Sequence, residues 1–167
     1  MVFGFFLFLR EGPTKGRMIK LQEKLDELKV SLEKEQQSLF SLNSIQKFLT
    51  YFKKLNFYKD EVEKLLINYF RLMEENNYHI DREKSTQLGI DYVMKIGYYY
   101  SGQLGFKMKM NFSFAIFWGL IIDSLFLVTG FLQKVYYLPI ATILMILYWT
   151  YLKLFYERNN KVFAVRY

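Results

Sequence analysis

Hydrophobic and polar positions divide the chain into two parts. Two apolar runs near the C-terminus, Phe112–Leu132 and Val135–Leu152, are separated only by Gln133 and Lys134. Each run has about the 17–25 residues that a helix needs to cross the hydrocarbon core of a bilayer. Because the connection is so short, we expect a tight transmembrane helical hairpin over residues 111–156.

Leucines upstream of this hairpin follow the repeat of a helix that packs against another helix. They alternate at spacings of four and three over about three heptads, and Glu35 interrupts the seam. The pattern predicts a heptad-bearing helix over residues 18–57, either in a coiled coil or in a small bundle, and at this length the two are not separable. The seam residues are Leu21, Leu25, Leu28, Leu32, Leu39 and Leu42.

Further amphipathic helices and a juxtamembrane segment are expected over residues 58–110. One should begin around Lys59, with acidic residues in its first turn that complement the partial positive charge of a helix N-terminus. Another should begin after Asp81 as its N-cap and run through Tyr99. The expected fold class is therefore an all-α membrane protein, with N-terminal amphipathic helices followed by a C-terminal transmembrane hairpin.

Two terminal segments stand apart from these helices. Residues 1–17 contain a short apolar stretch that is too short to span a bilayer. It is either an anchor for a membrane surface or a partner, or an upstream artefact before a true start at Met18. Residues 157–167 form a tail on the cytoplasmic side. Its apolar members, such as Phe163, favour docking onto the protein's own bundle or a partner subunit.

Charge placement favours a membrane surface over nucleic acid. The formal net charge is +7, but most basic residues are scattered among acids or stand just outside the apolar runs. The bias of basic residues toward the outer flanks of the hairpin predicts that both termini lie on the cytoplasmic side, or on the matrix side in an organelle. The expected interface anchors are Tyr136, Tyr137, Trp149, Lys107, Lys109, Lys153 and Arg158.

Asp123 lies near the middle of the first apolar run, where an ionised carboxylate is costly unless it faces protein or water. Gly119 and Gly130 share its helical face, with Ser124 and Thr129 alongside. One interpretation is a protonated Asp123 that joins helices, within the hairpin or between protomers. The others are an ion- or proton-pathway residue in an oligomer and an ion pair with another subunit.

The remaining sequence carries no pattern typical of catalysis. Cysteine is absent, the only histidine is His79 in a polar segment, and no glycine-rich phosphate loop is present. We therefore expect no catalytic residue, cofactor or metal. The expected function is a non-enzymatic membrane-complex subunit whose partners are the lipid bilayer and other subunits, or further copies, bound through the heptad helix and the Asp123 face. The alternative is a homo-oligomeric pore with Asp123 lining the path.

Overall fold

The structure is a computed structural model, and it describes residues 14–130 and 138–164. Its described residues are mostly helical, in agreement with the all-α class. The chain divides into two units. Unit 1 comprises Met1–Met108 and Phe163–Tyr167, and unit 2 comprises Lys109–Val162. Unit 2 is therefore an insertion between two segments that belong to the same unit.

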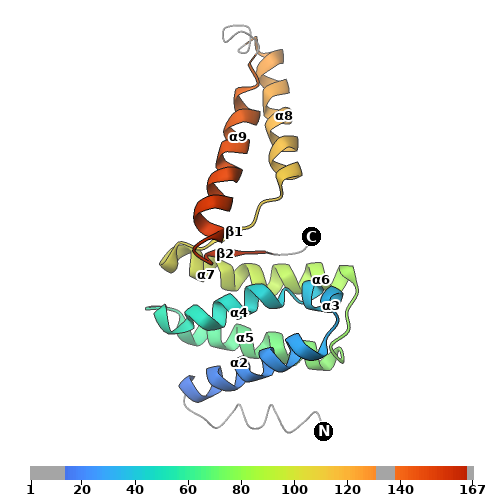
Figure 1. Cartoon of the computed structure of the whole chain (residues 1–167), viewed down its shortest axis with the longest axis vertical. Coiled ribbons are helices and arrows are strands. Elements are labelled where there is room, and N and C mark those ends of the chain that lie inside the picture. The colour runs from blue at the N-terminus through green and yellow to red at the C-terminus, as the bar shows by residue number, and fades with distance from the viewer. Residues whose placement is uncertain (1–13, 131–137, 165–167) are drawn as a thin grey trace. The chain divides into compact units, whose positions relative to one another are not determined.

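Unit 1 is a bundle of short helices. The helices α4 and α5 form its centre, α2 packs on both of them, and α7 contacts the same pair from the other side (Figure 1). Its elements are α2 (Thr14–Ser31), α3 (Lys34–Leu39), α4 (Leu42–Tyr51), η1 (Phe52–Lys54), α5 (Lys59–Glu75), α6 (Arg82–Leu88), the π-helical segment η2 (Gly89–Met94), α7 (Lys95–Leu104) and β1 (Lys107–Met108).

The predicted heptad-bearing helix over residues 18–57 is divided in the structure into α2, α3, α4 and the short 3₁₀ helix η1. The chain turns at Glu33 and again at Ser41, whose φ of 48° lies in the left-handed region. The first helix also begins at Thr14, so the predicted boundary at residue 17 falls inside it. Each turn redirects the apolar face, and the seam leucines point into one shared core.

Burial of the seam leucines distinguishes the two predicted alternatives, a coiled coil and a bundle. Leu21, Leu25 and Leu42 have no exposed surface, Leu28 and Leu39 are 4% exposed, and Leu32 packs against the same cluster. Leucines buried this completely inside one chain are not available as a seam for a partner helix. The structure therefore has the intramolecular bundle.

The next helices follow the sequence more closely. The helix α5 begins at Lys59 as predicted, and the Asp81 carboxylate caps α6 by accepting a hydrogen bond of 2.8 Å from the Lys84 amide. The predicted third helix contains the π-helical segment η2 and continues to Leu104. It ends at Gly105, whose φ of 70° suits the left-handed end of a helix.

The C-terminal segment packs on unit 1. Docking onto the protein's own bundle was one of the two predicted alternatives, and a partner subunit was the other. Its strand β2 (Val162–Phe163) pairs with β1. The Phe163 ring lies in the core with its centroid 5.7 Å from that of Phe48. Next to it, the Ala164 amide and carbonyl both bond to the Ser44 hydroxyl, each at 2.9 Å.

Unit 2 is built on two apolar helices that pack side by side (Figure 1). The first is α8 (Phe112–Val128), and the second is α9 (Ile140–Tyr151), which continues through the π-helical segment η4 (Leu152–Glu157). The helix α8 is shorter than the run Phe112–Leu132 that predicts it, whereas α9 and η4 together extend from Ile140 to Glu157, five residues beyond the end of the second run. The predicted turn at Gln133 and Lys134 lies outside the described residues.

One described helix is long and apolar enough to cross a membrane. It is Ile140–Glu157, with 18 residues, whereas Phe112–Val128 is a shorter apolar helix of 17 residues.

Candidate functional site

The Asp123 carboxylate of α8 binds the first turn of α9. One oxygen, Oδ1, accepts a hydrogen bond of 2.9 Å from the Ala141 amide. The other, Oδ2, accepts one of 2.9 Å from the Thr142 amide and one of 2.7 Å from the Thr142 hydroxyl. The side chain is only 6% exposed, so these three bonds replace water almost completely.

These hydrogen bonds satisfy polar groups of both helices, the carboxylate of α8 and the first amides of α9. The first amides of an α-helix lack an intrahelical acceptor, and Pro139, at the N-cap position of α9, provides no side-chain cap. Asp123 supplies the missing acceptor from the neighbouring helix, and its negative charge faces the positive end of the α9 dipole. All three partners donate, which is the pattern of an acceptor-only, ionised carboxylate. The predicted interhelical bond is thus present within the hairpin, but it requires no proton on Asp123.

Close contact between the helices depends on small residues. Ala115, Gly119 and Asp123 form the buried stripe of α8 at spacings of four residues. A Cβ atom placed on Gly119 would lie 2.5 Å from the Thr142 Cα, a distance that real Cβ atoms essentially never show. The missing side chain at Gly119 therefore lets the two backbones approach, one turn away from the Asp123 bonds.

The other residues predicted on this face lie elsewhere. Ser124 is exposed, and its hydroxyl donates to the Leu120 carbonyl of its own helix. The Thr129 hydroxyl likewise donates to the Phe126 carbonyl. Gly130 follows the helix with a φ of 73°, a conformation that favours glycine, and none of the described residues lies within 4 Å of the place where its Cβ would be.

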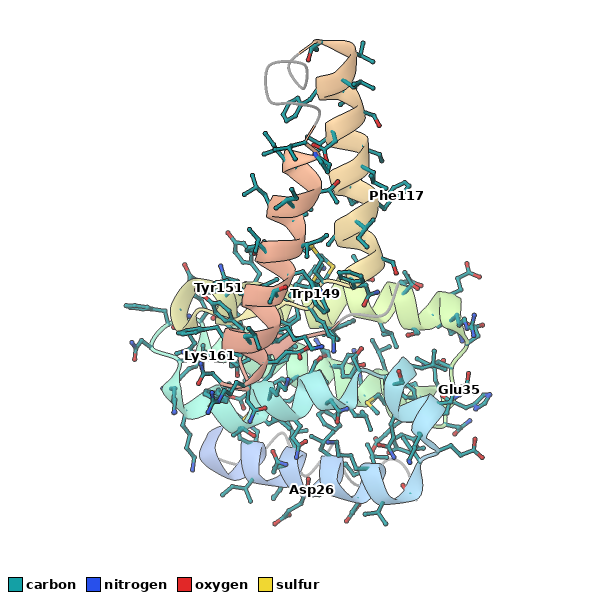
Figure 2. All side chains as sticks on the ribbon, turned by 45° about the horizontal axis from the view of Figure 1, so that its top comes forward. Asp26, Glu35, Phe117, Trp149, Tyr151 and Lys161 are labelled. Atoms are coloured by element: carbon teal, nitrogen blue, oxygen red, sulfur yellow. The ribbon has the colours of Figure 1, made fainter. Side chains whose placement is uncertain are left out.

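Most of the other exposed side chains of the described hairpin residues are large and apolar. Apart from the buried stripe, large side chains project outward along both helices, as Phe117 does in Figure 2. The exposed set includes Phe114, Phe117, Trp118, Leu120, Leu125, Leu127 and Val128 of α8, and Ile143, Leu144, Leu147, Tyr148 and Tyr151 of α9. An apolar surface of this extent is unusual for a protein surrounded by water.

Aromatic rings gather where the hairpin begins and ends. The Trp149 ring lies 4.9 Å from that of Phe112 between centroids, and Tyr151 stacks on Phe155 at 5.6 Å (Trp149 and Tyr151 are labelled in Figure 2). Aromatic side chains with a polar edge are enriched at the membrane–water interface. Of the other predicted interface anchors, Tyr136 and Tyr137 lie outside the described residues, whereas Lys107 and Arg158 are exposed.

Charged side chains accompany these rings in unit 2. The Lys153 ammonium lies over the Trp149 ring, 5.0 Å from its centroid, and the Lys109 ammonium lies 3.0 Å from the Glu157 carboxylate. All four side chains line one hollow of about 150 Å³, together with Met110, Leu152 and Val162. The sequence predicted the two lysines and Trp149 as anchors, but it did not indicate that Glu157 joins them.

Unit 1 buries polar groups that serve its own packing. The hydroxyls of Tyr69 and Tyr100 donate to the carbonyls of Phe40 and Phe48, and burial raises the pKa of both tyrosines above the ordinary value. Arg17 forms an ion pair with the buried Glu63 carboxylate. Over residues 14–130 and 138–164, no group of three or more His, Cys, Asp or Glu side chains is placed to hold a metal ion.

Comparisons with known proteins add no relative. No protein-family model, no curated protein and no solved structure matches the chain. The arguments about function therefore depend on the geometry of its own residues.

Proposed function

We propose that this chain is a non-enzymatic integral membrane protein, in which the α8–α9 hairpin enters the bilayer and unit 1 stays in the aqueous phase. The observation that carries the proposal is the apolar surface of the hairpin. Val128, Leu125 and Leu154 are 86%, 61% and 68% exposed, although each is a residue that proteins normally cover.

The distribution of this surface favours lipid over a single protein partner. A partner would cover one face, whereas only the stripe facing α9 is buried in α8 and all other sides carry large apolar groups. Lipid surrounds a hairpin on every side except the contact between its helices. The one acidic side chain inside the hairpin, Asp123, is satisfied by α9, so it does not oppose insertion.

The chain topology also agrees with a hairpin that enters the bilayer from one side and returns to the same side. The strands β1 and β2 pair with each other, and they precede and follow the hairpin in the chain. We propose two spans, with both termini on the cytoplasmic side or, in an organelle, the matrix side. The basic residues Lys107, Lys109, Lys153 and Arg158, which flank the hairpin, support this orientation.

Within the membrane, we propose that the protein is a subunit of a larger complex. Partner binding is no longer assigned to the leucine seam, because those leucines are used inside unit 1. It is assigned to one part of the outer face of the hairpin, where rings such as Phe117 and Trp118 provide large contact areas, while lipid covers the rest of that face. The pore alternative gains no support from Asp123, since both of its oxygens are bound within the hairpin.

Cysteine accessibility tests the two-span arrangement, because the natural chain has no cysteine. Single variants Thr50→Cys in unit 1, Thr129→Cys after α8 and Asn159→Cys after η4 would be labelled in sealed vesicles with a membrane-impermeant maleimide. We expect Thr50→Cys and Asn159→Cys to react from one side and Thr129→Cys only from the other. Reaction of all three from the same side would exclude two spans.

The subunit proposal has a separate test. The complex would be extracted in mild detergent, and its mass and components would be determined. A second protein present at a fixed ratio would support the subunit role. A particle of several copies of this chain alone would contradict it and make the pore alternative the better explanation.

A further inference from the structure

The hollow of unit 2 near Trp149 combines features that the membrane proposal does not by itself explain. Two ammonium groups, one carboxylate, one indole and three apolar side chains line it. It lies between the residues that precede α8 and the last turns that follow α9, so it is at the end of the hairpin where the chain enters and leaves.

Its size and polarity suit a small anion attached to an apolar group. The hollow has a volume of about 150 Å³, well above the roughly 10–15 Å³ that a single water molecule requires, so it has room for a phosphate group. Lys109 and Lys153 offer positive charge, whereas Leu152 and Val162 form an apolar wall. A phospholipid headgroup at the membrane interface has the same combination of charge and apolar chain.

The Glu157 carboxylate already forms an ion pair with one of the two lysines, Lys109. The Glu157 carboxylate lies 3.0 Å from the Lys109 ammonium, and the two side chains are 35% and 53% exposed. Ion pairs as exposed as this one are weak, because water competes for both partners. A phosphate with one or two negative charges can therefore displace Glu157 from Lys109.

The second cation is held by the aromatic ring. The Lys153 ammonium stays 5.0 Å from the Trp149 centroid, a contact that keeps the charge at the hollow without neutralising it. Asp123 and Glu157 are the only acids among residues 109–162, and Asp123 is fully used within the hairpin. Glu157 is thus the one acid of this segment that opposes a bound anion.

We propose that this hollow binds the phosphate headgroup of an anionic phospholipid, held by Lys109 and Lys153 with Glu157 as a built-in competitor. The inference rests on the proposed membrane insertion. It adds that one lipid class binds at a defined place, with Trp149 as its neighbour.

Trp149 itself reports on this site. The chain has two tryptophans, so a Trp118→Phe background leaves Trp149 as the only indole. The full-length protein in a neutral detergent would be titrated with phosphatidylglycerol, with phosphatidylcholine and with inorganic phosphate, and Trp149 emission would be recorded. We expect a saturable change with phosphatidylglycerol alone. An equal response to phosphatidylcholine, or saturation by inorganic phosphate, would overturn the proposal.

Four charge variants distinguish a defined site from general electrostatic attraction. A single basic residue near an anionic surface contributes roughly fivefold to affinity without any specific contact. Arg158→Gln, an exposed residue that does not line the hollow, measures that background. We expect Lys109→Gln and Lys153→Gln to weaken the response at least about fivefold more than Arg158→Gln does, and Glu157→Gln to strengthen it. Equal effects of the three basic variants would refute the site.

The experiment distinguishes failure of the headgroup site from failure of the proposed membrane insertion. Each variant is also tested for cofractionation with vesicles and for the cysteine accessibility described above. Loss of the lipid response in a protein that still inserts refutes only the headgroup site, whereas failure of the parent protein to insert refutes the proposed function.

Discussion

The Phe163 ring lies directly over Gly97 of α7. A Cβ atom placed on Gly97 would be 2.4 Å from the Phe163 Cζ, well inside van der Waals contact. The absence of a side chain at Gly97 therefore makes the seat for a residue that lies more than sixty positions later in the chain. This contact accounts for a glycine in the middle of a helix, where glycine is otherwise unfavourable.

Gly97→Ala is expected to destabilise unit 1 by about 1–3 kcal/mol, because the Phe163 ring must move out of the core. Urea unfolding followed by circular dichroism in detergent measures the change. Gly102→Ala is the matched control, since it lies in the same helix and its Cβ would meet nothing within 4 Å. It should stabilise by up to about 1 kcal/mol. Equal shifts in the two variants would show that Phe163 does not occupy this seat.

Asp123→Ala is expected to loosen the hairpin by about 3 kcal/mol, because one buried and two partly buried donors lose their acceptor. Thr142→Val removes only the hydroxyl bond and should cost about 1–2 kcal/mol. Helix unfolding in mixed detergent, with increasing dodecyl sulfate, measures both. Ser124→Ala serves as the control, because that hydroxyl bonds only to its own helix.

The two substitutions should not be additive. Once Asp123 is replaced by alanine, the Thr142 hydroxyl has lost its acceptor, so adding Thr142→Val should cost much less than it does alone. Independent effects would mean that the two residues do not share a hydrogen bond.

Gly119→Ala is expected to separate α8 from α9, because its Cβ would meet the Thr142 backbone and not a movable side chain. We expect a loss of about 3 kcal/mol, at the upper end of the range for overpacking. The same dodecyl sulfate titration measures it, and Ser113→Ala, at an exposed site in the first turn of α8, is the control. A loss no greater than that of the control would contradict the close backbone approach.

Leu28→Lys separates the bundle from a coiled coil. Because Leu28 is 4% exposed within unit 1, the buried charge should unfold this unit, with a loss of about 3 kcal/mol or more. Val30→Lys, on an 89% exposed residue of the same helix, should change stability by less than about 0.5 kcal/mol. Thermal unfolding of each variant and the mass of its assembly are measured on the same sample. A change in the mass of the assembly with folding intact would support the coiled coil.

Stability of unit 1 is expected to fall above about pH 10. Burial raises the pKa of Tyr69 and Tyr100 in the folded chain, so these phenols ionise near pH 10 only after unfolding. The unfolded chain then binds fewer protons, and stability falls by about 1.4 kcal/mol per pH unit for each tyrosine. Below about pH 10 the two states carry the same protons and this contribution is constant. Urea unfolding from pH 8 to 11.5 measures the slope.

Tyr100→Phe should reduce that slope by one tyrosine's share, at the cost of leaving the Phe48 carbonyl without its donor. Tyr98→Phe is the control, because Tyr98 is 78% exposed. An unchanged slope in Tyr100→Phe would show that its phenol ionises normally in the folded chain.

Much of the local structure of unit 1 follows from short-range patterns. The acidic first turn placed the start of α5 at Lys59, and Asp81 was identified as an N-cap, because both signals act within a few residues. The turns at Glu33 and Ser41 had no glycine or proline to mark them. They exist because the leucines on both sides share one core, which is a tertiary effect.

The candidate site was predictable only in part. Helical spacing grouped Gly119 with Asp123, and the cost of a carboxylate in an apolar run indicated that Asp123 needs partners. Two of its three donors are backbone amides in the first turn of α9, which no side-chain pattern indicates. Ala115 was overlooked because alanine carries no polar signal, although its spacing of four residues from Gly119 was readable.

Because Phe163 lies in the core of unit 1, a fragment made to contain this unit alone must include the C-terminal residues as well as the N-terminal ones. Ending the chain at Met108 would remove a ring from the core of unit 1 and the partner strand of β1, and would leave Ser44 without Ala164. Because β1 and β2 are neighbours, a short flexible linker from Met108 to Val162 would replace the apolar hairpin and keep the last strand. The hairpin could therefore be replaced without removing any part of unit 1, because unit 1 consists of two segments that flank the hairpin in the sequence.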